Sequence, residues 1–449
     1  MTECNSELPY DFYSRRQLVV RFSGLELSSD AGILLARQAE EQVQVCRGLA
    51  ECIEEWRDQN KITHSLNQLV SQRVYQIVGG YEDANDSNVL RHDPIYKIAC
   101  ERLPIAEQDL LASQPTITRL ENHVSKQEVA AMRRRMVDGF IKGYKTAPEE
   151  LVLDIDGWDD PTHGNQQLSC FHGYYGTHMY FPVLINEAST GYPLVLQLRA
   201  GNSHSGKGVA GILRWLFWRL KRVWPGVRLI LRADAGFSLP EVIQVCERSG
   251  VGYAFGFSRN AVLNRKIADL LERARLKYIQ TQQKARLFDD VYYAAGTWDA
   301  PRRLVMKAEW LPKGANPRFV VTNLDLPPQQ LYDNFYVQRG SESEHRIKEL
   351  KLSIKADRLS CSTFVANQFR LLLSQAAYIL MIAIRQAAAG TQLATAQVER
   401  LRLLLIKGAA KVTVSARRVL VELAAFCPFA DALRQIARNL SKSLSLKFE

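Results

Sequence analysis

The sequence lacks three patterns, and each absence excludes a class of protein. Its eight cysteines are scattered without a Cys-x-x-Cys pair, which argues against a zinc knuckle or disulfide framework and indicates a reducing, cytoplasmic setting. The first residues contain no apolar run that would mark a signal peptide. The longest apolar stretch, 371–384, lies between two arginines and is shorter than the roughly 20 residues that span a bilayer. It predicts a buried core helix, and no membrane partner is expected.

Internal repeats, low-complexity segments and a nucleotide-binding motif are also missing. The segment "GNSHSGKG" (201–208) contains glycine and lysine but lacks the Walker spacing, so no nucleotide cofactor is expected. What is present is a chain of 449 residues with an ordinary globular composition, long enough for about two to four structural units. Its net charge of +11 favours a polyanionic partner such as nucleic acid.

The order of helical and strand patterns divides the chain into five regions. Capped segments with helical spacing dominate the start, and after Pro148 strands alternate with helices, which predicts an α/β fold with mixed strand directions. Three strand-like runs then interrupt that alternation before helices return. We expect a mostly helical region at 1–147, an α/β core in two parts at 148–259 and 329–390, a β-rich insertion at 260–328, and a C-terminal region at 391–449.

The end of the chain is strongly basic. From Cys361 onward twelve arginines and lysines stand against four acidic residues, so this fifth of the chain carries +8 of the net charge of +11. The pattern in the C-terminal region predicts a helix, a β-ribbon and a final basic helix. Such a concentration of positive charge favours contact with phosphates.

Two predicted strands of the α/β core end in aspartate. In "LVLDIDGW", Asp154 and Asp156 are two residues apart and therefore lie on one face of the strand. In "LILRADAGF", Asp234 ends the second strand. Active sites of open α/β sheets gather beyond the carboxyl ends of strands, where two such aspartates would converge. The alternative is that each aspartate merely caps a turn or a helix.

A carboxylate pair in a basic protein suggests a Mg²⁺ site for phosphoryl transfer, which normally has a third acid. Mg²⁺ prefers hard oxygen ligands, and a pair of ions can stabilise both the attacking and the leaving oxygen. The stretch "GSESEHRIKELK" (340–351) offers Glu344. The alternative there is a capped surface helix, because Ser341 and Glu344 form a capping box and Lys348 and Lys351 share the face of Glu344.

Five segments carry a resemblance to a known family. They are "GGYEDANDSNVLRHDP" (79–94), "LDIDGWDDPTHG" (153–164), "LRAGN" (198–202), "LRADAGF" (231–237) and "YVQRGSESEHRIKELK" (336–351). In order and spacing they resemble bacterial insertion-sequence transposases of the DDE type over nearly the whole chain, and they look most like the insertion-sequence 1380 family, which is related to the piggyBac-like elements. The resemblance implies an RNase H-like mixed-sheet core that a β-rich insertion interrupts and that bears three acids at one edge.

The related families share a signature of Tyr, two residues, Arg, three residues, Glu, six residues, Lys. Tyr336 and Arg339 keep the first spacing, and Glu344 keeps the last, but four residues instead of three separate Arg339 from Glu344. The strict count falls on Ser343, which cannot replace a carboxylate, and the rival Glu342 breaks the spacing to the lysine. The resemblance therefore implies that the catalytic acids and metal ligands are Asp156, Asp234 and Glu344, with Asp154 as the alternative first acid.

The resemblance also implies ligands and partners. The acids are expected to hold Mg²⁺, for which Mn²⁺ is a plausible substitute, and the DNA-binding residues are expected to be Tyr336, Arg339, Arg346, Lys348 and Lys351. The expected partner is double-stranded DNA, both the terminal inverted repeats of the element and the target. The N-terminal helices and the basic C-terminal region would bind the ends, in a homodimer that is cytoplasmic in a bacterium and nucleoid-associated when bound to DNA.

The implied reaction is cleavage of the element ends by water, followed by attack of the freed 3′-hydroxyl on target DNA, in relatives often through hairpin ends. Trp298 and Trp310 in the insertion are candidates for stacking on a flipped base, and the alternative is that both are buried for packing. Two other functions stay open from sequence. The chain could be a two-metal nuclease without strand transfer, or a domesticated transposase derivative that only binds DNA.

Overall fold

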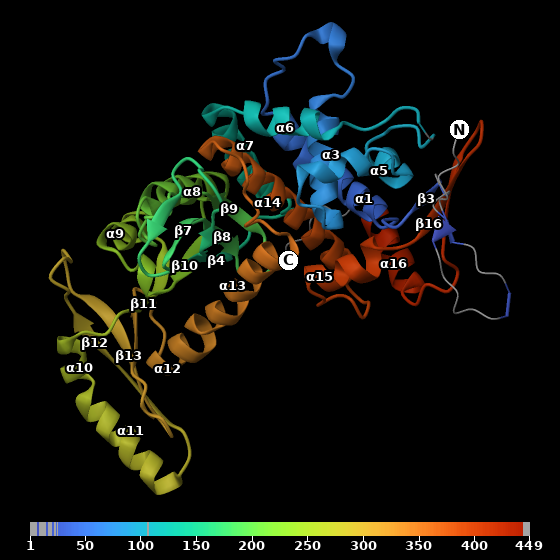
Figure 1. Cartoon of the computed structure of the whole chain (residues 1–449). Coiled ribbons are helices and arrows are strands. Elements are labelled where there is room, and N and C mark those ends of the chain that lie inside the picture. Colours follow the sequence, from blue (N-terminus) through green and yellow to red (C-terminus); the bar gives the residue numbers. More distant parts are fainter. Residues whose placement is uncertain are drawn as a thin grey trace.

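The computed structural model describes residues 7–8, 15–16, 20–21, 24, 26–105 and 107–442, with the side chains of 341–343 outside the described set. Figure 1 shows a helical part formed by both ends of the chain, an α/β part beside it, and an arm that projects from the α/β part. The structure is therefore a mixed α/β protein, as the order of sequence patterns predicts.

The N-terminal region is helical as predicted. Its main helices are α1 (Ile33–Val43), α2 (Val45–Ala50), α3 (Leu66–Gly79), α5 (Pro94–Ala99), α6 (Gln114–His123) and α7 (Lys126–Lys142), with a short α4 (Ser87–Leu90). Helices α3 and α7 begin with capping boxes, Ser65 with Gln68 and Ser125 with Glu128. Helix α3 ends at Gly80, whose left-handed φ of 92° a side chain would strain. Local sequence signals therefore set the ends of these helices.

A mixed sheet forms the centre of the α/β part. Strand β10 (Arg228–Ala233) pairs in parallel with β4 (Glu150–Gly157) on one side and with β11 (Gly252–Phe257) on the other. The hairpin of β8 (Val183–Glu187) and β9 (Pro193–Gln197) continues the sheet antiparallel to β4, as the turn between them predicts. Strand β9 thus runs in the direction of β4, and the carboxyl ends of β4, β9, β10 and β11 share one edge.

The two faces of this sheet carry different helices. Helices α8 (Val209–Val223) and α9 (Pro240–Arg248) belong to the large core, together with Leu153, Leu231 and Phe255 from alternate positions of the strands. On the opposite face, Ile230 and Ala254 form a smaller core with a π-helical turn, Leu331–Tyr336. That turn follows α12 (Pro328–Gln330) and leads into α13 (Gln338–Lys348), so this helical segment crosses the face that bears the aspartates.

The segment 260–328 differs from the β-rich insertion that the sequence predicts. It begins with two helices, α10 (Ala261–Lys266) and α11 (Ala268–Thr281), before β12 (Ala285–Tyr293), β13 (Arg302–Leu311), β14 (Gly314–Ala315) and β15 (Arg318–Thr322). Its strands extend the central sheet, because β15 pairs antiparallel with β11 and β13 pairs with β15. Helix α11 lies along β12 and β13 in the projecting arm (Figure 1).

Helix α14 (Phe364–Ala387) joins the helical part to the α/β part. It is long and apolar enough to cross a membrane by composition alone, but it is buried within the protein, as the core-helix prediction requires. It packs against α1, α3 and α6 of the N-terminal region and against β9 of the sheet. A second π-helical turn, Glu349–Ser353, links α13 towards it.

The C-terminal region packs on the N-terminal helices. It contains α15 (Val398–Leu401), the hairpin of β16 (Ala410–Val414) and β17 (Val419–Leu423), and α16 (Ala430–Ser441). Strand β16 pairs on its other side with β3 (Leu27–Ser28), and α16 packs against α1 and α14. Small strands complete the fold: β1 (Glu7–Leu8) with β2 (Val20–Arg21), and β7 (Thr177–Tyr180) with β5 (Asp160–Pro161) and β6 (Cys170–His172).

Candidate functional site

The strand register places two aspartates side by side. Ala233 of β10 is level with Ile155 of β4, so the next residues, Asp234 and Asp156, are level at the carboxyl edge of two adjacent parallel strands. Asp156 lies at the end of β4, and Asp234 follows β10 and accepts the backbone N–H of Gly236 at 2.9 Å. Both predicted roles are thus present at once, since Asp234 caps a turn and still lies beside Asp156.

Asp154, the alternative first acid, lies on the same face but has a different partner. Both of its carboxylate oxygens accept hydrogen bonds from Arg232, at 2.7 and 2.8 Å, and the Asp154 side chain is fully buried. Arg232 also donates to the Phe335 carbonyl, at 2.9 Å. This bidentate pair joins two strands and a helix one step inside the sheet edge, so the geometry favours Asp156 over Asp154 as the acid open to a substrate.

The segment that crosses the sheet brings a tyrosine and an arginine to the aspartates. Arg339 of α13 donates to the Asp156 carboxylate at 3.1 Å and also lies close enough to Tyr336 for its guanidinium to face that ring, at 5.9 Å. Tyr336 covers Gly256 so closely that a Cβ there would lie 2.5 Å from the tyrosine hydroxyl oxygen. Glycine at the end of β11 therefore makes room for this aromatic ring beside Asp234.

The charges of these groups influence one another. Burial raises the pKa of Asp156 to about 6, with the charge of Asp234 raising it further and Arg339 lowering it. The pKa of Tyr336 is also raised, chiefly by burial. For Arg339 burial is the largest effect and lowers the pKa, but Asp156, Tyr336 and Asp234 act together to raise it overall. The two carboxylates therefore oppose each other's ionisation, and the Arg339 guanidinium offsets part of their charge through Asp156.

The structure does not bring Glu344 to the two aspartates. Glu344 is exposed on α13, five residues after Arg339, which places it about 140° around the helix from Arg339. The side chains of the rivals Glu342 and Ser343 lie outside the described residues. Among the side chains that the structure describes, no three acids, histidines or cysteines gather around a point that a metal could occupy.

The other predicted DNA-binding residues have different surroundings. Lys351 donates to the carbonyl and the carboxylate of Asp159, at 2.9 and 3.1 Å, in the loop that follows Asp156. Lys348 is exposed. Arg346 turns towards the protein, where it lies against Gly191 in the β8–β9 turn and 3.6 Å from Glu349. Only Tyr336, Arg339 and Lys351 therefore lie at the edge that bears the aspartates.

The donor set fits a hard divalent cation. Asp156 and Asp234 offer hard oxygen ligands on adjacent strands, and a cation between them would offset the repulsion of their charges. Mg²⁺ keeps several waters and is often held by one or two carboxylates together with substrate phosphates, so two carboxylates suffice for a site that a substrate completes.

One neighbouring residue was not predicted as functional. Arg199, which follows β9 at the same sheet edge, is buried and donates to the carbonyls of Phe181 and Ser205, at 3.0 and 2.5 Å. It fixes the loop 201–208, whose Ser205 lies so close to Gly236 that a Cβ there would be 2.8 Å away. The segment "LRAGN", which carries part of the family resemblance, was the signal that pointed to this loop.

The two tryptophans of the insertion are packed within it. Trp298 contacts the rings of Phe257 and Tyr293, with centroids at 5.2 and 5.7 Å, and Arg302 lies over its ring. Trp310 is half-buried at the end of β13. These contacts favour the packing alternative over a free stacking surface for either ring.

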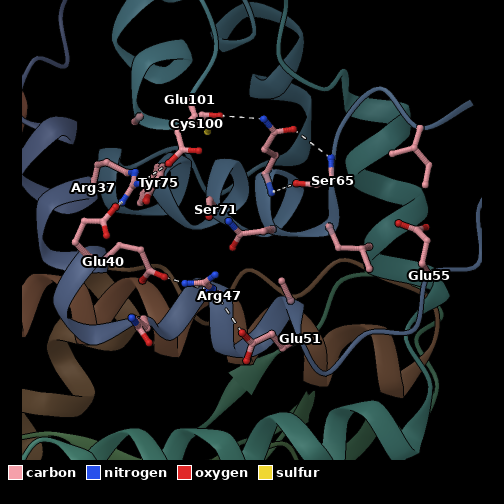
Figure 2. Close-up of a pocket in the computed structure, with 18 of the residues that line it drawn as sticks. Arg37, Glu40, Arg47, Glu51, Glu55, Ser65, Ser71, Tyr75, Cys100 and Glu101 are labelled. Carbon is pink, nitrogen blue, oxygen red and sulfur yellow. Dashed lines mark hydrogen bonds and ion pairs between the residues drawn. The ribbon is translucent and has the colours of Figure 1, made fainter. Parts of the chain in front are cut away.

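A cavity of considerable size lies elsewhere, among the N-terminal helices. Its volume is about 710 Å³, and Figure 2 shows Arg37, Glu40 and Arg47 along its walls. Arg37 pairs with Glu41 and with Glu101 on its rim. Glu40 is buried and accepts the backbone N–H groups of Cys46 and Arg47, at 3.1 and 3.0 Å, so it caps the start of α2. The ionic groups here are paired with one another, and their excess of glutamates does not suit a polyanion.

The sequence matches a known protein family over almost its whole length. A family model described as transposase DDE domain group 1 matches residues 11–445. No curated protein matches the sequence. Among solved structures, the chain is similar to one described as the cryo-EM structure of a piggyBac transposase synaptic complex with hairpin DNA, with a TM-score of 0.43 and 12% identity over 85% of this chain and 80% of that one. At this low level of similarity, the likeness does not indicate a function for this chain.

Proposed function

Because the chain belongs to the transposase DDE domain group 1 family, we propose that it cuts the ends of an insertion sequence and joins them to target DNA by Mg²⁺-dependent phosphoryl transfer. Within that family we propose an RNase H-like core of the insertion-sequence 1380 type. The observation that carries the proposal is the pair Asp156 and Asp234, level on adjacent parallel strands with Arg339 facing it. Mn²⁺ is expected to substitute for Mg²⁺ because it accepts the same oxygen ligands.

Each residue at the sheet edge has a role in this reaction. Asp156 and Asp234 would hold the metal, which when bound activates the attacking oxygen and offsets charge on the leaving one. Arg339, paired with Asp156, is placed to turn its remaining N–H groups to a phosphate of the cut strand. The Tyr336 ring lies against the Arg339 guanidinium and supports it. Lys351 binds the Asp159 carboxylate and so fixes the loop that follows Asp156.

The third acid is proposed to be Glu344. Its support is the spacing to Lys351, which lies at the loop after Asp156 and so keeps α13 beside the site. The Glu344 side chain is exposed, so its carboxylate is accessible to a DNA-bound metal if α13 rotates about its axis. Lys348 and the basic C-terminal region are proposed to contact double-stranded DNA, both the terminal repeats and the target, in a homodimer that holds two ends.

One assay separates this function from its alternatives. The full chain is incubated with Mg²⁺, labelled duplexes that carry the inverted repeats flanking its gene, and a supercoiled target plasmid. Cleaved ends joined to the plasmid are expected. Cleavage without joined products would assign the two-metal nuclease, and retention of the duplex without cleavage in Mg²⁺ or Mn²⁺ would assign a DNA-binding derivative. Asp234→Asn is the inactive control, since it removes a ligand and keeps the turn.

A further inference from the structure

The outer edge of the C-terminal hairpin is unpaired. Strands β17, β16 and β3 form a three-stranded sheet in that order, so β17 is an edge strand. In the part of the chain that the structure describes, no strand pairs with its outer edge. Figure 1 shows β16 and β3 at the side of the molecule opposite the projecting arm, away from the α/β part. An exposed apolar edge strand is a template for pairing with another chain.

The alternation of hydrogen bonds identifies which backbone groups face outward. Ser415 donates to the Arg418 carbonyl at 2.9 Å in the hairpin turn, and this pair belongs to the same register as Thr413 with Leu420. Because bonded and non-bonded pairs alternate along antiparallel strands, Leu420 directs its N–H and C=O towards β16. Val419 and Val421 therefore direct theirs to the open edge.

The side chains around this edge are apolar and exposed. Val419, Leu420 and Leu423 are 42%, 40% and 45% exposed, and Phe426 just beyond the strand is 90% exposed. Beneath the strand, Val421 borders a cavity of about 630 Å³ with apolar walls from α1, the 403–405 segment and α16. An exposed patch of this kind marks a protein partner, whereas DNA-binding surfaces are more polar and strongly positive.

We propose that β17 pairs antiparallel with β17 of a second copy of this chain, about a two-fold axis at Leu420. In that register Leu420 lies opposite Leu420 of the second copy as a non-bonded pair, and Val419 exchanges both backbone hydrogen bonds with Val421 of the second copy. This arrangement uses the outward-facing backbone groups of Val419 and Val421 as donors and acceptors.

Charge complementarity selects this register over its neighbours. With the axis at Leu420, Arg418 of each copy faces Glu422 of the other, so two opposite-charge pairs form on the outer face. An axis at Val421 would instead place Leu420 opposite Glu422 and leave Arg418 opposite Ala424. The outward backbone groups permit several axes, and charge pairing favours the one at Leu420.

The alternative occupants of this edge are the two ends of the chain. The N-terminal segment enters the sheet at β3, which is the strand farthest from β17. The C-terminal residues 443–449, which follow α16, are the other alternative occupant of the β17 edge. This interface would be the contact surface of the homodimer in the proposed function, and the inference rests on that homodimer. Self-association can nevertheless be measured without DNA or metal.

A charge-reversal series tests the proposal on the full chain. Sedimentation equilibrium is expected to give a dimer for the wild type and about ten-fold weaker self-association for Arg418→Glu and for Glu422→Arg, because each puts like charges opposite one another twice. The double variant Arg418→Glu/Glu422→Arg is expected to restore wild-type affinity. Monomeric wild type, or a double variant no stronger than the single ones, would overturn the proposal.

A cross-link tests the axis independently. Leu420→Cys is expected to form an intermolecular disulfide under mild oxidation, because only the residue on the axis faces its own copy at a non-bonded pair. Lys411→Cys on β16, which is also exposed, is the matched control and should give no more cross-link than wild type. Equal cross-linking of the two variants would overturn the axis at Leu420.

Truncation and activity separate the remaining outcomes. If removing residues 443–449 or 1–25 converts a monomer into a dimer, the edge belongs to the chain's own end and the proposal fails. DNA cleavage by a protein that is dimeric with no response to the Arg418 and Glu422 variants would overturn this interface and leave the proposed function standing. A dimer that responds as expected to these variants but does not cleave DNA would support this interface and overturn the proposed function.

Discussion

At the scale of single residues, two aspartates of one strand have different roles for a reason that lies outside their strand. Asp154 and Asp156 share a face, and sequence alone could place them there but could not choose between them. The choice depends on Arg232 of β10, which the parallel register sets opposite Asp154 and which occupies both of its carboxylate oxygens. Register between distant strands is not encoded in local periodicity, so the sequence left both aspartates open.

Substitution of Asp156 is expected to affect activity, and substitution of Asp154 is expected to affect stability. Asp156→Asn should abolish DNA cleavage with little change in stability, because burial opposes the charge of Asp156 and raises its pKa to about 6. Asp154→Asn should cost about 3 kcal/mol of unfolding free energy, since it leaves the buried Arg232 guanidinium without its charge partner. Urea unfolding and the end-cleavage assay measure both. A fully stable, inactive Asp154→Asn protein with active Asp156→Asn would transfer the first acid to Asp154.

A second residue, Asp160, predicts a pH dependence of stability. It is buried, and both carboxylate oxygens lack a hydrogen-bond partner among the described residues. Burial raises its pKa well above the ordinary value, and Asp357 adds to that effect. A raised pKa in the folded state favours the protonated form, so this contribution to stability is complete below the unfolded pKa near 4 and is lost as the pH rises towards the folded pKa.

Asp160→Asn should prevent the loss of stability that the ionisation of Asp160 causes as the pH rises. Near pH 7.5 the variant is expected to have a higher unfolding free energy than the wild type, and near pH 4 the two should have similar unfolding free energies. Urea unfolding at a series of pH values measures the difference. Asp159→Asn is the matched control, because Asp159 is paired with Lys351 and is partly exposed. Parallel pH curves for Asp160→Asn and wild type would show that Asp160 is ionised in the folded protein.

At the scale of elements, α13 is where the sequence and the structure agree least. The family signature spaces its arginine and glutamate four positions apart, which places both on one face of a helix. The additional residue before Glu344 rotates it by about 100° from that face. Extra residues are accommodated in π-helical turns on either side of α13, at Leu331–Tyr336 and Glu349–Ser353, and such turns are frequent at functional sites. Local patterns predicted the helix, and the family resemblance implied that it lies near Asp156, but neither predicted its rotation.

The identity of the third acid follows from two matched substitutions on this helix. Glu344→Gln is expected to lower end cleavage at least about 100-fold while leaving binding of the duplex unchanged, because it removes a metal ligand and no phosphate contact. Glu342→Gln is the control and should retain cleavage. Gel-shift binding and labelled-end cleavage are compared for both. An inactive Glu342→Gln protein beside an active Glu344→Gln protein would assign Glu342 as the acid.

At the scale of the whole molecule, the parts that sequence could not predict are contacts between distant segments. The hairpin of β8 and β9 and the helices α3 and α7 follow from local turn signals and sequence patterns, and the structure confirms them. The serine and aspartate caps predicted for α1 are not formed, because its N-cap is Gly32. The addition of β15 to β11 and of β16 to β3 joins segments far apart in the chain. These pairings depend on which strand edges are open after the core forms, and a single sequence carries no direct signal of that.

The salt dependence of DNA binding tells which outer part of the molecule contacts phosphates. Arg438 and Lys442 lie four residues apart at the exposed end of α16, and Arg273 and Lys277 form a matched exposed pair on α11 of the projecting arm. If the C-terminal region binds the element ends, Arg438→Gln/Lys442→Gln should lower the slope of log affinity against log salt by about 2, because each phosphate contact releases about one counterion. Arg273→Gln/Lys277→Gln should leave the slope unchanged. Fluorescence anisotropy with an end duplex between about 50 and 200 mM salt measures both. A lower slope for the arm variant alone would move the DNA-binding surface from the C-terminal region to the arm.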